Sequence, residues 1–371
     1  MLHLQREDGV ICRIIVSKKE KEVIIMKRLI ALFLSLMMLV LAFTACAQSS
    51  DTSSDVSDAS SESSAVSDAS DESKVEEKAL VRIAGMKGPT SIGMVEIMEN
   101  DEKGTTKNDY EFTIAGTADE ITLLLKKGEL DIAAVPANLA SVLYNNTNGE
   151  IQILGVNTLG VLYLVAKGVE INSIDDLKGK TIIATGKGTT PEYTLTHILK
   201  EKGIEDVTLD FKAEATEVVA ALSQVESGIA MLPQPYVTVA QGKVEGLEIV
   251  MDLNKEWKAI NSDNGIVTGV FVVRKAFAEE NPTAVKNFIE EYKVSSAYVN
   301  ENVEEAAQLV EKFGIFAANV AVKAIPYCNI ACIVGEDMKT PVNTYLGVLY
   351  ANNEKSVGGK LPENDFFYIA E

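Results

Sequence analysis

The sequence predicts an α/β protein with two doubly wound lobes, preceded by an export signal and a disordered tether. Short apolar runs alternate with amphipathic helical stretches from Leu80 onward, which is typical of βαβ units and of a mostly parallel sheet. The same alternation starts again at Thr181, so a second unit follows the first. The chain from Ala79 to Glu371 is long enough for two hydrophobic cores.

Residues 26–45 have the three parts of a secretory signal peptide. Met26 is followed by two basic residues, then by the apolar run Leu29 to Phe43, which is shorter than the roughly twenty residues that span a bilayer. Small residues precede Cys46, as in a lipobox, and we therefore expect lipid on Cys46, although Phe43 stands where such boxes usually carry Leu. An ordinary signal with a bystander cysteine and a permanent membrane anchor are the alternatives. We interpret residues 1–25 as a mis-annotated extension before the true start at Met26; the alternative is a genuine long n-region that starts at Met1.

Residues 46–78 follow as a segment made almost wholly of Ser, Asp, Glu, Ala and Val. Such a composition buries too little apolar surface to offset the entropy of ordering, and its like charges repel one another. We expect a disordered tether between the lipid and the folded part, and an interaction tail is the alternative.

Composition excludes several classes of function. The formal net charge of −20 disfavours nucleic acid and anionic lipid as main partners. His197 is the only histidine beyond the leader, so a histidine-based metal centre or catalytic triad is hard to build. We expect no metal, no cofactor and no catalytic residue. Cys328 and Cys332 either form a local disulfide or remain as two buried thiols.

Local patterns predict the elements of both units. We expect strands at 80–84, 112–115, 131–135, 151–156, 161–165, 181–184, 207–211, 229–232, 249–253 and 267–273. Helices are expected at 92–100, 119–128, 139–144, 193–200, 216–227 and 236–241. Trp257 falls in a predicted loop, and the chain reads as helical from Asn281 to Tyr350, first over 284–300 and 303–313.

Four loops that follow predicted strands are candidates for a ligand site, because ligands of open α/β sheets bind beyond the carboxyl ends of strands. Two glycines, two threonines and a helix start at 186–190 suit an anion or a polar head group. The predicted ligand-binding residues are Gly88, Pro89, Thr90, Ser91, Asn138, Gly186, Lys187, Gly188, Thr189, Thr190 and Gln234.

Each candidate also has a purely structural interpretation. Thr189 or Thr190 could be a helix cap, Asn138 could cap its own helix, and the prolines beside Gln234 could only shape the chain. Asn157-Thr158 is as consistent with a hinge as with a ligand contact. Lys187 could neutralise an anion or stay in solvent, and Trp257 could be an aromatic platform or packing.

Several of these motifs resemble a known family. Residues 177–182 followed by 186–192 resemble the start of the second lobe in periplasmic-type solute-binding proteins, in the branch that serves ABC importers for nitrate, sulfonates, taurine and thiamine-pyrimidine precursors. Residues 128–133, 232–236 and 272–275 fit the same pattern, and the resemblance covers 80–371. It implies a periplasmic binding protein type II fold, with lobes joined by crossing strands and ligand held between them. Lobe 1 would be 79–158 with 268–371, and lobe 2 would be 159–267.

The resemblance implies an extracytoplasmic, membrane-anchored and monomeric lipoprotein that passes a small organic solute to an ABC permease and its ATPase. A sulfonate would suit 186–190, whereas a pyrimidine would need stacking on Tyr193, Tyr236 or Trp257. One alternative is an enzyme that resembles the pyrimidine-precursor synthases of this fold. The histidine-bearing site and the cysteine-rich cluster of those enzymes are not apparent here, so an enzyme in this chain would use Asp131, Glu192 or Glu214 for catalysis. The other alternative is a sensory lipoprotein without a transporter.

Overall fold

The structure, a computed structural model, describes residues 78–262 and 264–369. The predicted extension, the signal peptide, Cys46 and the tether up to residue 77 lie outside the described residues. Within the described part of the chain, no helix is both long and apolar enough to span a bilayer.

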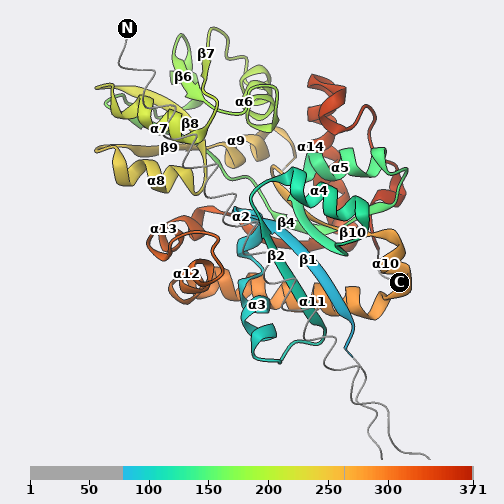
Figure 1. Cartoon of the computed structure of the whole chain (residues 1–371). Coiled ribbons are helices and arrows are strands. Elements are labelled where there is room, and N and C mark those ends of the chain that lie inside the picture. Colours follow the sequence, from blue (N-terminus) through green and yellow to red (C-terminus); the bar gives the residue numbers. More distant parts are fainter. Residues whose placement is uncertain (1–77, 263, 370–371) are drawn as a thin grey trace, which may run out of the picture. The chain divides into compact units, whose positions relative to one another are not determined.

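Two mixed β-sheets form the framework of the described chain (Figure 1). The six-stranded sheet has the order β11-β4-β10-β3-β1-β2, and the five-stranded sheet has the order β7-β6-β8-β5-β9. The strands of the first are β1 (Leu80–Met86), β2 (Asp109–Ala115), β3 (Ile132–Pro136), β4 (Ile151–Thr158), β10 (Gly269–Arg274) and β11 (Ile330–Val334). Those of the second are β5 (Leu162–Lys167), β6 (Thr181–Ala184), β7 (Thr208–Phe211), β8 (Gly228–Pro233) and β9 (Glu248–Asp252).

Most strands of each sheet run in one direction, as predicted, but β5, β10 and β11 run the opposite way, so both sheets are mixed. Strand β10 is antiparallel to β3 and β4, and β5 is antiparallel to β8 and β9. Strand β5 follows directly on β4 of the other sheet, and β10 follows β9 of the other sheet after one helix at 253–260. Each of the two strands therefore runs against the strands that the local βαβ connections build. The parallel pairs are β1 with β2, β1 with β3, β6 with β7 and β6 with β8.

Helices cover both faces of the six-stranded sheet. Residues of α3 and α11 pack with Ile83, Ala134 and Phe271, whereas residues of α4, α5 and α14 pack with side chains that point the other way, such as Ala133 and Val270. The helices are α2 (Pro89–Ile92), α3 (Val95–Glu102), α4 (Ala118–Lys127), α5 (Ala137–Asn146), α6 (Thr190–Glu201), α7 (Ala215–Ser223), α8 (Tyr236–Lys243), α9 (Leu253–Ile260), α10 (Lys275–Glu280), α11 (Pro282–Glu301), α12 (Val303–Lys312), α13 (Ala318–Ala324) and α14 (Lys339–Asn352).

Local sequence signals explain where several of these helices begin and end. The Thr117 hydroxyl accepts from the Glu120 amide at the start of α4, and Gly128 ends this helix in the left-handed conformation. Proline stands in the first turn of α2, α6 and α11, where the missing N–H costs nothing.

Three element predictions need correction. The helix expected at 92–100 is two helices, because the chain leaves helical pairing at Gly93-Met94 between α2 and α3. The helical stretch after Asn281 is interrupted by β11, which pairs antiparallel with β4. Trp257 lies on α9, whose N-terminal cap is the Asp252 carboxylate, and is not in a loop. Cys332 lies on β11, and Cys328 and Cys332 are both free thiols.

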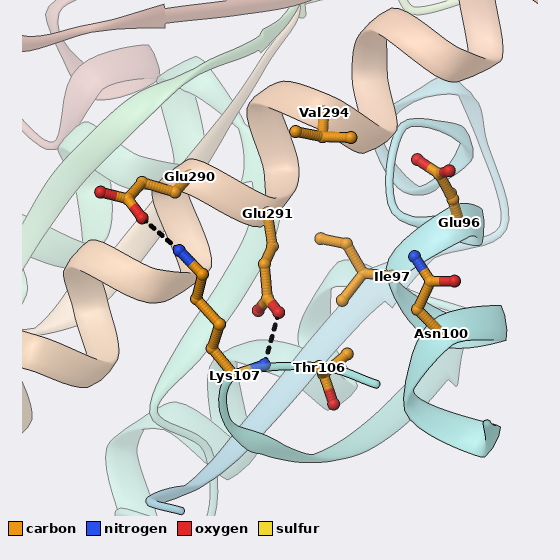
Figure 2. A pocket seen from close by; sticks show the side chains of 8 residues that line it. All are labelled: Glu96, Ile97, Asn100, Thr106, Lys107, Glu290, Glu291 and Val294. Carbon is orange, nitrogen blue, oxygen red and sulfur yellow. Dashed lines mark hydrogen bonds and ion pairs between the residues drawn. The ribbon is translucent and has the colours of Figure 1, made fainter. Parts of the chain in front are cut away.

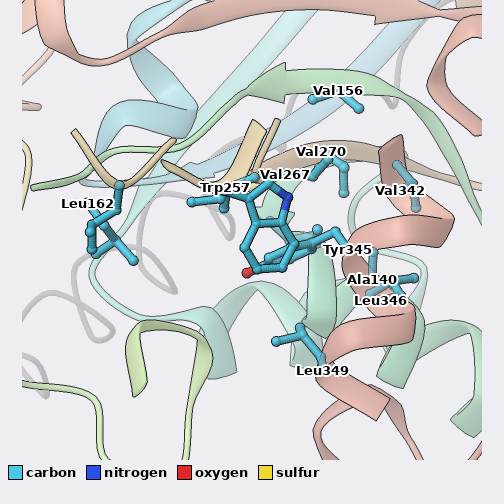
Figure 3. Close-up of a cluster of buried hydrophobic side chains, with 14 of the residues drawn as sticks. Ala140, Val156, Leu162, Trp257, Val267, Val270, Val342, Tyr345, Leu346 and Leu349 are labelled. Atoms are coloured by element: carbon cyan, nitrogen blue, oxygen red, sulfur yellow. The ribbon is translucent and has the colours of Figure 1, made fainter. Parts of the chain in front are cut away.

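One hydrophobic cluster is continuous between the two sheets. Figure 3 shows its centre, where Trp257 of α9 and Tyr345 of α14 lie among aliphatic side chains. The same cluster contains Leu164 and Ile182 from the five-stranded sheet and Val270 from the six-stranded sheet. Its core therefore holds the two sheets together near the crossing segments.

Candidate functional site

The chain crosses between the sheets at two segments that lie side by side. The first leads from Thr158 at the end of β4 to Leu162 of β5, and the second leads back into β10 at Gly269. The Thr268 amide donates to the Thr158 carbonyl at 3.0 Å, and the Gln234 amide donates to the Val161 carbonyl at 2.9 Å. The carboxyl ends of β4 and β8 therefore both lie beside the crossing, where the fold favours a ligand.

Four polar residues at this crossing are buried with unused hydrogen-bonding capacity. We call Thr90, Asn157, Thr158 and Gln234 the crossing cluster. Asn157 and Thr158 are fully buried, Gln234 is 2% exposed and Thr90 is 6% exposed. Both side-chain polar atoms of Asn157, both threonine hydroxyls and Gln234 Nε2 have no hydrogen-bond partner among the described residues. Buried polar groups are nearly always paired, so such a concentration indicates a place prepared for another molecule.

Gly269 brings part of this cluster together. A Cβ at residue 269 would lie 2.4 Å from Thr90 Cγ2 and 2.5 Å from Asn157 Oδ1, so both side chains converge over this glycine. Because residue 269 of β10 is a glycine, there is room for the Thr90 and Asn157 side chains to approach the strand. Gln234 is held differently: its Oε1 accepts from Thr238 Oγ1 at 3.0 Å, which directs the unpaired Nε2 away from that contact.

The other predicted residues around Thr90 serve the helix start. Gly88 precedes α2 in an extended conformation and Pro89 is its first residue. Ser91 is fully buried, and its hydroxyl donates to the Met86 carbonyl at 2.6 Å, which closes the turn between β1 and α2. Asn138 does not cap its own helix; its Nδ2 donates to the Ser356 carbonyl at 3.4 Å.

The predicted loop 186–190 is folded onto its own helix. Gly186 and Gly188 have φ of +78° and +72°, as the turn requires. The Thr189 hydroxyl donates to the Gly186 carbonyl at 2.6 Å, and Lys187 is exposed. The Gly188 amide donates to the Glu192 carboxylate, so a negative charge of the chain itself already occupies the start of α6.

Two of the three aromatic residues considered for stacking are engaged elsewhere, whereas Tyr236, the first residue of α8, is 37% exposed and follows Gln234 by two residues. The Tyr193 hydroxyl donates to the Gly188 carbonyl and accepts from Asn353 Nδ2, each at 2.9 Å. Trp257 is fully buried, with ring centroids 4.9 Å from His197 and 5.7 Å from Tyr345. Burial lowers the pKa of His197 and raises the pKa of Tyr345 to about 12, while the Thr190 and Thr194 hydroxyls beside Tyr345 act in the opposite direction.

The carboxylates considered for catalysis do not form a pair. Asp131 precedes β3, at the opposite end of that strand from the crossing, and its carboxylate accepts from Arg82 and Arg274, each at 2.7 Å. Although burial opposes ionisation, these hydrogen bonds leave the pKa of Asp131 below its usual value. Glu214 accepts from its neighbour Thr216 at 3.3 Å, and Glu192 is bound to Gly188.

A separate hollow of about 350 Å³ lies between α3 and α11 (Figure 2). Glu290 pairs with Lys107 Nζ at 2.5 Å and Glu291 accepts from the Lys107 amide at 2.6 Å. The Lys107 loop precedes β2, so this hollow lies at the amino end of that strand, away from the carboxyl edge where the crossing cluster lies.

Comparisons with known proteins agree with this architecture. The NMT1/THI5-like family model matches residues 149–306. An ABC transporter protein from Parabacteroides distasonis is 24% identical, with a TM-score of 0.67, over 79% of this chain and 100% of that one. The fold is that of the periplasmic solute-binding proteins. The resemblance predicted from the sequence motifs is thereby confirmed.

Two sulfonate-binding proteins share this periplasmic solute-binding fold. The periplasmic aliphatic sulphonate-binding protein of Escherichia coli is 17% identical, with a TM-score of 0.64, over 80% of this chain and 94% of that one. The alkanesulfonate-binding protein of Xanthomonas axonopodis pv. citri, bound to MOPS, is 14% identical, with a TM-score of 0.54, over 77% and 96%. Among curated protein sequences, none matches this chain significantly.

Sequence reasoning singled out Thr90 and Gln234 as ligand contacts but left Asn157 and Thr158 between a hinge and a contact. Their position at the end of a predicted strand, just before a crossover, was the available signal. Gly269 was missed altogether, since nothing local distinguishes it from any other glycine that begins a strand.

Proposed function

We propose that this protein is an extracytoplasmic solute-binding lipoprotein that captures a small organic solute and delivers it to an ABC importer. The observation that carries the proposal is the crossing cluster, whose buried donors and acceptors have no partners within residues 78–262 and 264–369 and lie at the junction of two sheets in a periplasmic-binding fold. We take the lobes as 79–158 with 268–371 and as 159–267. Contacts with both lobes would favour the closed over the open arrangement.

The proposal is of a binding protein and not of an enzyme. Its support is the nature of the structural neighbours and the separate engagement of Asp131, Glu192 and Glu214. The predicted partners are the solute, a permease and its ATPase, and the predicted oligomeric state is a monomer. Lipid on Cys46 and the acidic tether would keep the solute trap near the permease.

A thermal-shift screen tests the binding function. The chain from residue 46, carrying Cys46→Ser to prevent lipidation, is heated with sulfonates, nitrate, thiamine precursors, nucleobases, amides and amino acids. A ligand that binds only the native state raises the melting temperature. At a ligand concentration one hundred times Kd, it raises the free energy of unfolding by about 2.7 kcal/mol. Hydrolysis or conversion of the hit during incubation would favour an enzyme. A screen without any response would remove the support for solute capture.

The lipid anchor has its own test. Cells that express the full chain are fed an alkyne-labelled fatty acid, and the protein is probed for incorporated label. We expect label on the wild-type protein and none on Cys46→Ala, which is instead released from the membrane. Equal membrane retention of both forms would indicate a different anchor.

A further inference from the structure

We propose that the solute is uncharged and presents a hydrogen-bond donor next to an acceptor, as a carboxamide or an aminopyrimidine does, and that Asn157 binds this edge. The inference rests on the proposed function and narrows it, because solutes of the resembling families include both anions and neutral heterocycles.

The chemistry of Asn157 is the first argument. Its fully buried carboxamide offers an N–H donor and a carbonyl acceptor side by side, and neither has a partner among the described residues. An amide-like edge on the solute satisfies both through two parallel hydrogen bonds. A deprotonated sulfonate or carboxylate has no donor, so it would leave Asn157 Oδ1 unpaired and facing a negative charge.

The charges around the crossing cluster give the second argument. Every side chain in the cluster is neutral, and no Lys, Arg or His side chain in the described ranges is buried. The lysines that follow strands toward this region, Lys87 and Lys187, are exposed to solvent. A buried anion is costly without a buried cation to pair with it, whereas a neutral polar solute needs only hydrogen bonds.

The start of α6 gives the third argument, and it is independent of Asn157. This was the position at which the sequence favoured an anion. The carboxylate of Glu192 already accepts from the Gly188 amide there, so a bound anion would meet like charge. The Glu192 carboxylate therefore takes the position at the start of α6 that an anionic ligand would otherwise occupy.

Matched probes test the inference. Nicotinamide, nicotinate and pyridine-3-sulfonate share one ring and differ in charge and donor content, and 4-aminopyrimidine adds a second neutral donor–acceptor edge. Binding to the chain from residue 46 is measured by calorimetry and by thermal shift. We expect a neutral probe to bind at least tenfold more tightly than its anionic counterparts.

The outcomes separate the two proposals. An anionic probe that binds as tightly as nicotinamide, or more tightly, overturns the neutral-solute inference and leaves solute capture standing. If none of the four probes binds, the neutral-solute inference is overturned. The proposal of solute capture is overturned as well only if no compound in the thermal-shift screen binds.

Variants test the role of Asn157. Asn157→Asp keeps the shape but replaces the donor with a second, charged acceptor, so we expect neutral-probe affinity to fall at least tenfold. Thr90→Val, which keeps shape and loses only a hydroxyl, provides a second route should Asn157→Asp not fold. Thr106→Val is the matched control, because that buried hydroxyl is bonded to Asp101 at 3.2 Å and belongs to the other end of the sheet. Unchanged affinity in both Asn157→Asp and Thr90→Val would overturn the assignment.

Discussion

At the scale of single residues, two buried asparagines have opposite hydrogen-bonding states. Asn157 is fully buried, and its side chain has no partner in the part of the chain that the structure describes. Asn108, 1% exposed, donates to the Tyr110 hydroxyl at 3.0 Å and to the Ala284 carbonyl at 2.9 Å. An unpaired buried polar group costs about 1–3 kcal/mol. The unpaired side chain of Asn157 therefore lowers the stability of the ligand-free protein, as we expect of a residue whose hydrogen bonds are made only with a bound solute.

A pair of isosteric substitutions checks this. We expect Asn157→Leu to leave the free energy of unfolding unchanged or to raise it by about 1 kcal/mol, since it removes the unpaired groups. Asn108→Leu should lower the free energy of unfolding by about 2 kcal/mol, because Tyr110 and Ala284 lose their partner. Urea denaturation of both variants without ligand decides the matter. Equal destabilisation by the two would mean that Asn157 is paired in solution.

His197 gives a prediction about pH. Its folded-state pKa lies below the unfolded value of about 6.5 because burial disfavours the charged form. Its contribution to stability is therefore present above pH 6.5 and is lost as pH falls through the folded pKa. The stability of the wild type should fall more steeply between pH 7 and 5 than that of His197→Phe. Parallel profiles in urea titrations would show that His197 titrates normally.

At the scale of elements, one buried carboxylate connects three strands. Asp131, directly before β3, accepts from Arg82 of β1 and from Arg274 of β10, and its side chain is 2% exposed. This arrangement holds the amino end of β3 between its two neighbours in the sheet. The opposite end of the same sheet is free to carry the crossing cluster.

Asp131→Ala should lower the free energy of unfolding by about 3 kcal/mol at pH 7, because two partly buried arginines lose their common partner. The folded-state pKa of Asp131 is depressed, so its contribution is present above the unfolded pKa of about 3.9 and is lost as pH falls through the folded pKa. The difference between wild type and variant should therefore shrink in urea titrations toward pH 2. Asp175→Ala, in an exposed pair with Lys178, is the control and should change stability by less than about 1 kcal/mol.

At the scale of the whole molecule, the continuous core between the sheets determines how the protein unfolds. Leu164 and Ile182 of one sheet share a cluster with Ala133 and Val270 of the other, and Trp257 lies within it. We expect one cooperative transition for residues 78–369, with a calorimetric enthalpy equal to the van't Hoff enthalpy. Fluorescence of Trp257, the only tryptophan, should change at the same temperature as the circular dichroism signal. Two separate transitions would show that the lobes unfold independently.

Much of the fold was predictable because burial leaves a local pattern. The period of apolar residues identifies strands such as 132–135 and 229–232, and proline and glycine mark helix ends near Pro191 and Gly128. Strand β11 was missed because its apolar run stands between helices and is too short for its period to be distinguished from a helical one.

The candidate site was predictable only in part. Thr90 and Gln234 follow strand ends, which the sequence reveals, so both could be named. The state of Asn157 could not be predicted, since an asparagine at a crossover is equally suited to pairing with the backbone and to remaining unpaired.

The sequence by itself determined the α/β class, the strand-to-helix loops and the resemblance to solute-binding proteins, because each depends on residues close together in the chain. Only the tertiary structure decided that β5 and β10 run against their neighbours, since their direction depends on the sheet that each leaves. It also brought Thr90, Asn157 and Gly269 together and placed Glu192 at the start of α6. Burial and the choice of hydrogen-bond partner depend on segments far apart in the chain, and no local pattern specifies them.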